Sequence, residues 1–97
     1  MTERIGKPVL VTTEYRGVFF GYATETSGDT ITLTAARNCI YWPSGQGGFG
    51  GLASDGPVKG SRIGARVDKM ELRKITAVAE CTPAAVEAWE AANVYRG

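Results

Sequence analysis

One stretch of the sequence decides the fold: VFFGYATETSGDTITLTA, residues 18–35. Within it, Val18–Glu25 has apolar side chains on both faces of a strand, which predicts a central position in a sheet. Thr26–Asp29 has the composition of a hairpin turn, and Thr30–Ala35 alternates threonine with apolar residues at a period of two. The stretch therefore predicts an antiparallel hairpin whose second strand has one buried face and one solvated face.

Further strands are expected on both sides of this hairpin. Pro8–Glu14 is rich in β-branched residues, and its proline stands in the first position, where a missing N–H donor is tolerated. A tight turn at Tyr15–Gly17 would join this strand to the hairpin. After the hairpin, strands are predicted at Arg37–Trp42, Ile63–Val67 and Glu71–Glu80. The alternation of the last segment slips once, which predicts a bulge near Lys74.

The C-terminal region changes to a helical pattern. Thr82 is a typical N-cap, and Pro83 suits the first helical position, where its missing N–H would have no partner. The alanine-rich segment Ala84–Ala92 predicts a short helix that docks on the sheet through Val86 and Trp89. The 97 residues allow one domain, residues 1–97, with a single modest core. We predict a mainly β fold: a small antiparallel β-barrel or sandwich of about five or six strands, with a Gly-rich insert and one C-terminal helix.

A glycine-rich tract interrupts the strands after residue 42. Six of the 13 glycines lie between Gly45 and Gly56, and ordering a glycine costs more backbone entropy than ordering any other residue. We expect this cost to be offset by binding of a ligand or a partner. The tract approximates the GxGxxG pattern of phosphate-binding loops, but it follows an aromatic-proline corner and opens no long helix of a βαβ unit. The alternative interpretation is a flexible surface loop, with a single helical turn around Leu52–Ser54.

An aromatic pair precedes the tract. If Ile40 and Trp42 face the core, then Arg37 and Tyr41 share an outer surface by alternation. A flat ring beside a guanidinium could stack a nucleobase while holding a phosphate. The alternative is that one of the two aromatic rings only fills the core.

Cationic residues follow the tract. Lys59 and Arg62 place two cations within four residues, with the hydroxyl of Ser61 between them. Phe49, isolated among glycines, is expected to be a lid over a ligand, an anchor in a neighbouring subunit, or an anchor that fixes the tract to its own core. The predicted ligand-binding residues are Arg37, Tyr41, Trp42, Phe49, Lys59, Ser61 and Arg62.

The composition argues against an enzyme and against a metal or cofactor site. Histidine, the most common general acid or base near neutral pH, is absent. The acidic residues are scattered singly, so no catalytic pair and no group with metal-ligand spacing stands out. Cys39 has no histidine to activate it and is interpreted as a buried structural residue. Whether Cys39 lies close to Cys81 is left open.

Charge and hydropathy limit the partners and the location. The net charge is +1, which does not favour duplex nucleic acid or an anionic membrane, because such binding needs many phosphate-neutralising side chains. No apolar run approaches the roughly 20 residues that span a bilayer, and residues 1–25 lack the apolar core of a signal peptide. We therefore expect a cytoplasmic protein with both thiols reduced.

Several short motifs together resemble a known family. They are Val9–Val11 followed by Tyr15 and Gly17–Gly21, Ala36–Arg37 with Tyr41–Trp42, Leu52–Ala53 with Gly56, and Val67–Leu72 leading to Glu80–Thr82. With these motifs the chain is similar to small, uncharacterised proteins of tailed phages and prophages of about this length. The resemblance implies no established activity. It implies a phage setting in the cytoplasm of a host bacterium, and a segment after the aromatic pair that is similar to a compact helical piece.

These observations favour a binding protein without catalytic activity. Small phage β-proteins include decoys that sequester nucleotide signals of bacterial immunity, and by this analogy we expect a small nucleotide-like ligand here. One alternative is a protein-interaction or virion-assembly module. Another is a small barrel that binds single-stranded nucleic acid, which the charge opposes. A homo-oligomer is expected from the Gly-rich segment and from the two apolar faces of Val18–Ala23.

Overall fold

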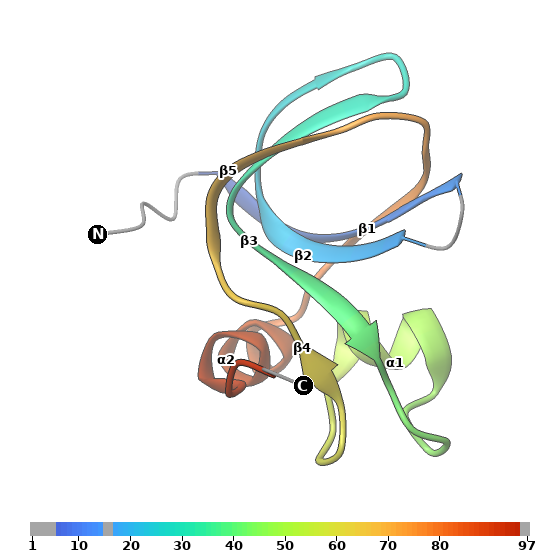
Figure 1. Cartoon of the computed structure of the whole chain (residues 1–97). Coiled ribbons are helices and arrows are strands. Elements are labelled where there is room, and N and C mark those ends of the chain that lie inside the picture. Colours follow the sequence, from blue (N-terminus) through green and yellow to red (C-terminus); the bar gives the residue numbers. More distant parts are fainter. Residues whose placement is uncertain (1–5, 15–16, 96–97) are drawn as a thin grey trace.

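The computed structural model describes residues 6–14 and 17–95 (Figure 1). This part of the chain contains one curled antiparallel sheet and two helices. The strands are β1 (Lys7–Thr13), β2 (Gly17–Ser27), β3 (Thr30–Tyr41), β4 (Arg62–Ile63), β5 (Val67–Leu72) and β6 (Ile75–Glu80). The helices are α1 (Gly48–Ser54) and α2 (Pro83–Ala91). The mainly β prediction is confirmed, although Tyr15 and Arg16 of the predicted turn lie outside the described residues.

The predicted hairpin forms the centre of the sheet. The strand order is β4-β3-β2-β1-β6, and β5 also pairs with β3. β2 therefore lies between β1 and β3, as its two apolar faces predict. Among the described strands, β4, β5 and β6 pair with only one neighbouring strand each, so the sheet curls without closing into a complete barrel (Figure 1).

Two irregularities divide β3, the longest strand. Ala35 has a positive φ of 50°, and the register with β2 shifts between Phe20 and Tyr22 on the partner strand. A second shift lies between Cys39 and Tyr41 in the pairing with β4. Such β-bulges bend a strand and change which face its side chains occupy. As a result, the first half of β3 pairs with β5 and its end pairs with β4.

The strands after the glycine tract differ from the sequence prediction. Only Arg62–Ile63 forms β4, and Val67 begins a separate strand that pairs with β3. The predicted single strand Glu71–Glu80 is wrong, because the chain turns at Lys74, which has a positive φ of 57°. The following residues form β6 against β1. The slip in alternation at this point therefore marks a break between two strands.

The core consists of two clusters on the two faces of the curled sheet. The first lies under the helices and includes Phe20, whose ring stacks on Trp89 with centroids 5.2 Å apart and planes 5° apart. The second includes Val11 and Leu33. β2 contributes to both, because Phe20 packs in the first cluster and Phe19 packs against the second. Both apolar faces of β2 are thus covered by its own chain, and they give no reason to expect a second subunit.

The predicted C-terminal helix is confirmed with its cap. The side chain of Thr82 accepts a hydrogen bond of 3.1 Å from the backbone N–H of Ala85, and Pro83 begins α2. Trp89 is fully buried, and its Nε1 donates to the carbonyl of Leu52 in α1 at 3.1 Å. The predicted helical turn at residues 52–54 extends to the seven residues of α1. The two helices together cover one end of the sheet (Figure 1).

Candidate functional site

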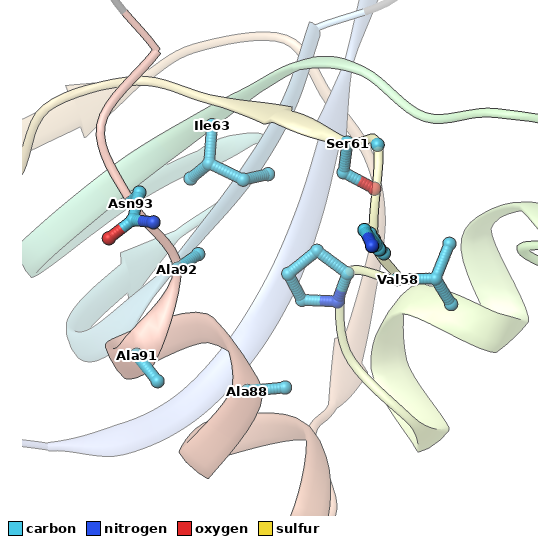
Figure 2. A pocket seen from close by; sticks show the side chains of 10 residues that line it. Val58, Ser61, Ile63, Ala88, Ala91, Ala92 and Asn93 are labelled. Carbon is cyan, nitrogen blue, oxygen red and sulfur yellow. The ribbon is translucent and has the colours of Figure 1, made fainter.

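A pocket lies between the turn Pro57–Ser61 and the C-terminal end of α2, and it is called the turn pocket below. Its volume is about 410 Å³. Figure 2 shows Ser61 and Val58 on one side, and Ala88 and Ala91 of α2 on the other. The lining residues come from the turn, β4, α2 and the segment after α2: Pro57, Val58, Lys59, Gly60, Ser61, Ile63, Ala88, Ala91, Ala92 and Asn93.

The wall of the turn pocket is held by a buried glutamine of the glycine tract. The Nε2 of Gln46 donates to the carbonyl of Gly56 at 2.7 Å, and its Oε1 accepts from the N–H of Val58 at 2.8 Å. Gly56 has a positive φ of 80°, and a Cβ there would lie 2.5 Å from the Cβ of Ala88. The tract therefore crosses α2 at a distance that only glycine permits. Gln46 was not singled out in the sequence, because an isolated glutamine among glycines carries no signal of burial.

Polar groups of the turn pocket come from three residues. Lys59 is exposed on the turn, and it has no hydrogen bond or ion pair within the described part of the chain. The Oγ of Ser61 is buried and has no hydrogen-bond partner among the described residues. An unsatisfied buried hydroxyl costs about 1–3 kcal/mol. Asn93, just after α2, adds an amide that can both donate and accept.

Arg37 lies behind the wall of the turn pocket and has a structural role. It is 1% exposed, and its Nη1 donates to the carbonyls of Trp89 at 2.8 Å and Ala92 at 2.7 Å, while its Nε donates to Gly64 at 3.0 Å. The two bonds to Trp89 and Ala92 satisfy carbonyls at the C-terminal end of α2, where a cation is also favoured by the helix dipole. Burial lowers the pKa of Arg37, and repulsion from Arg66 adds to this effect.

The predicted shared surface of Arg37 and Tyr41 is therefore wrong. Tyr41 is 45% exposed, whereas Arg37 is buried. The bulge between Cys39 and Tyr41 breaks the alternation that would place both side chains on one face. Ile40, which was expected to face the core together with Trp42, is 51% exposed, because it lies on the face of β3 opposite the buried side chains of Arg37 and Cys39. Trp42 is half buried and packs against the first core cluster, as expected.

Tyr41 instead contacts Arg62, its partner on β4. The guanidinium carbon of Arg62 lies 5.1 Å from the centroid of the Tyr41 ring and 5.0 Å from that of the Tyr95 ring. All three residues are exposed. Tyr95 is held there because its N–H donates to the carbonyl of Ile63 at 2.8 Å. We call Tyr41, Arg62 and Tyr95 the tyrosine–arginine face.

The seven predicted ligand-binding residues thus separate into three groups. Lys59 and Ser61 line the turn pocket. Tyr41 and Arg62 belong to the tyrosine–arginine face. The other three, which are Arg37, Trp42 and Phe49, are buried or half buried, and the rings of Trp42 and Phe49 pack against the first core cluster. Phe49 thereby fixes the glycine tract to its own domain.

Alternation separates the first two groups. Ser61 and Ile63 line the turn pocket, and Arg62 between them contributes to the opposite face of the strand. Tyr95 and Asn93 were not singled out from the sequence, because both follow the end of α2, and the path of this segment over β4 depends on tertiary contacts.

The two cysteines have a structural environment. Both thiols are free, and burial raises the pKa of Cys39 and that of Cys81 to about 11. Such thiols stay protonated near neutral pH and are weak nucleophiles. In the described ranges no three histidine, cysteine or acidic side chains gather as a metal site would require. No helix among them is long and apolar enough to cross a membrane.

Comparisons with known proteins identify a similar fold and the family of the chain. No curated protein matches the chain. A solved structure of a heptameric archaeal Sm protein matches with a TM-score of 0.53 and 17% sequence identity, over 81% of this chain and 91% of that protein. At this identity the likeness concerns the fold, which is Sm-like. Residues 6–89 match the model of a domain of unknown function, DUF6948, and the chain belongs to that family.

Proposed function

We propose that this protein binds a small nucleotide-like ligand in the turn pocket and releases it chemically unchanged. The observation that carries the proposal is the Oγ of Ser61, which is buried without a partner beside a pocket of about 410 Å³. Pockets for small ligands usually measure roughly 300–1,000 Å³, so this volume suits a ligand of mononucleotide size. A hydroxyl that is unsatisfied in the free protein can gain a hydrogen bond when the ligand binds.

The charges around the turn pocket support an anionic group on the ligand. Lys59 stands on the pocket wall with no acidic partner within the described part of the chain. The C-terminal end of a helix would repel an anion, but Arg37 donates to the carbonyl of Ala92, itself a lining residue. The buried guanidinium thus offsets the helix dipole behind the wall. Apolar side chains such as Ile63 and Ala88 offer a surface for a base, and Asn93 offers an amide to its edge.

The phage resemblance supplies the proposed setting. A protein of this kind would sequester a nucleotide signal of bacterial immunity in the cytoplasm of the host and so act against defence. This role rests on analogy with other phage proteins and extends the binding proposal. It requires binding without turnover, which the absence of histidine and of a paired acid in the sequence supports.

Isothermal titration against AMP, ADP-ribose and cyclic dinucleotides tests the proposal directly. We expect at least one of these probes to bind, and Lys59→Ala to weaken its binding by roughly tenfold, since hydrogen bonds to charged groups contribute about 1.5–3 kcal/mol. Lys69→Ala is the matched control, because it removes the same charge from β5, outside the pocket lining. Absence of heat with all probes, together with no ultraviolet-absorbing molecule released on denaturation, would reject the proposal.

Ser61→Ala gives a sharper test, because binding and stability should change in opposite directions. Removal of an unsatisfied buried hydroxyl should raise the stability of the free protein by about 1 kcal/mol. The same substitution should weaken the bound probe, since its hydrogen bond to Oγ is lost. A loss of stability in the free protein would show that the hydroxyl already has a structural partner.

We also propose that the protein forms a homo-oligomer. The similar Sm protein is heptameric, and β5 and β6 leave open sheet edges among the described strands. Open edges are available for pairing with another chain. Native mass spectrometry and light scattering at micromolar concentration should give one closed assembly. A monomer under these conditions would contradict the assembly proposal and leave the ligand proposal to its own titrations.

A further inference from the structure

The tyrosine–arginine face lies on the opposite side of β4 from the turn pocket. β3 and the residue Val94 pair with β4 on its two sides, so Tyr41 and Tyr95 flank Arg62. Ile40 is also exposed and borders the same face, since its Cδ1 lies 3.9 Å from where a Cβ would stand at Gly64. Three exposed side chains with large apolar parts, those of Ile40, Tyr41 and Tyr95, are therefore grouped around the guanidinium of Arg62.

The guanidinium of Arg62 differs from the others that the structure describes. Arg37, Arg66 and Arg73 each donate to oxygen atoms of the protein. Arg62 lies beside the two tyrosine rings, and among the described residues it makes no hydrogen bond or ion pair. The coplanar N–H groups along the edge of this guanidinium therefore remain available to bind a ligand. Ring contacts restrict a guanidinium before any ligand arrives, which lowers the entropy cost of binding.

We propose that the tyrosine–arginine face is a docking site for an acidic peptide segment of a protein partner, with a carboxylate bound edge-on by Arg62. A carboxylate has two coplanar oxygens that match the two-pronged edge of a guanidinium. Tyrosine and arginine are also the residues that most often dominate protein interfaces, while lysine and acidic residues are depleted there. The face has this composition.

The charge of the face favours a carboxylate over nucleic acid. Arg62 is the single cation among Ile40, Tyr41, Arg62 and Tyr95, and it matches the single charge of a carboxylate. Lys59 lies on the other side of the strand, in the wall of the turn pocket. Nucleic-acid affinity comes mainly from several phosphate contacts, which one guanidinium does not supply. The docking site is also independent of the proposed nucleotide ligand, because the two sites share no residue.

Nuclear magnetic resonance can test the docking site on the full chain. The probes are a capped tripeptide of leucine, glutamate and leucine, and its twin with glutamine in place of glutamate. We expect the glutamate peptide to shift the Nε–Hε signal of Arg62 and the ring signals of Tyr41 and Tyr95. The glutamine twin should bind about tenfold more weakly, since charge-assisted hydrogen bonds are about twice as strong as neutral ones.

Variants separate the docking site from the rest of the surface. Arg62→Lys keeps the charge but removes the planar fork, and it should weaken the glutamate peptide by about fivefold or more. Arg73→Lys is the matched control, because Arg73 is exposed and lies outside the face. Lys59→Ala should leave peptide binding unchanged, although it is expected to weaken nucleotide binding by roughly tenfold. Equal binding of the two peptides, or a shift of Arg62 caused only by a dinucleotide, would overturn the proposal.

Discussion

The region under α2 and the outer face of β4 each contain one well-placed arginine, and the two have opposite environments. Arg37 is buried and donates to three backbone carbonyls, two of them at the end of α2. Arg62 is exposed and contacts two rings. The comparison shows that the contacts of a guanidinium indicate whether its N–H donors support the fold or are available to bind a partner. Carbonyl partners use the donors to hold the fold, whereas ring partners orient the group and leave its donors free.

Arg37→Met should have the largest effect on stability. It removes three hydrogen bonds to buried or half-buried carbonyls and leaves the C-terminal end of α2 without its cap. We expect a loss of about 3 kcal/mol or more, which lowers Tm by roughly 12 °C or more in a domain of this size. Urea unfolding of the variant measures it. A loss below about 1 kcal/mol would break the comparison, because Arg37 would then not hold the fold.

The two thiols test the same distinction between interior and surface. Burial raises the pKa of both Cys39 and Cys81 to about 11, two units above the ordinary value. The thiolate fraction at pH 8 should therefore be about a hundredfold below that of an unperturbed thiol. The alkylation rate should fall by about tenfold or more, since a thiolate of higher pKa is also more nucleophilic. Reaction with iodoacetamide, followed by mass spectrometry, measures the rate in the native protein and in urea. Equal rates in both conditions would place the thiols at the surface.

A pair of glycine substitutions extends the comparison to the glycine tract. Gly56→Ala should destabilise the protein by about 2 kcal/mol, because the new Cβ would meet Ala88 and the φ of 80° is unfavourable for alanine. Gly50→Ala is the matched change in the middle of α1, where a Cβ would meet nothing within 4 Å. It should stabilise the protein by about 0.5–1 kcal/mol. Thermal unfolding distinguishes them, and equal effects would contradict the packing of the tract against α2.

Arg62→Ala should have the smallest effect on stability, at most about 0.5 kcal/mol. Exposed cation–π contacts contribute little, and Arg62 has no other described partner. Urea unfolding under the conditions used for Arg37→Met gives the direct contrast. A loss comparable to that of Arg37→Met would show that Arg62 also supports the fold, and its donors could not then be considered free for a partner.

The sequence predicted the elements whose side chains follow a regular period. The two apolar faces of Val18–Glu25 placed β2 at the centre of the sheet, and Thr82 with Pro83 located the start of α2. Both predictions depend on alternation and capping, which are local patterns that can be recognised from adjacent residues without knowledge of tertiary contacts.

The candidate site was predictable only in part, because its geometry depends on irregular backbone. A bulge between Cys39 and Tyr41 places Tyr41 on a different face of the strand from Arg37. The isoleucine at position 40 does not predict this bulge. Gln46 was missed because its burial results from the contact between the tract and α2. Lys59 and Ser61 could be singled out because two cations and a hydroxyl lie within four residues of sequence, and both residues line the turn pocket. Their separation from Arg62 required the structure.

The contacts between α1 and α2 have a consequence for how the protein is made. Thr82 bonds to the carbonyls of Ala53 and Ser54, and the indole of Trp89 bonds to that of Leu52. Thr82 follows Ser54 by 28 residues and Trp89 follows Leu52 by 37, so both anchors are translated after the segment that they hold. During synthesis the glycine tract is therefore made before α2 is available to pack on it. The turn pocket can form only after the segment that becomes α2 has emerged from the ribosome.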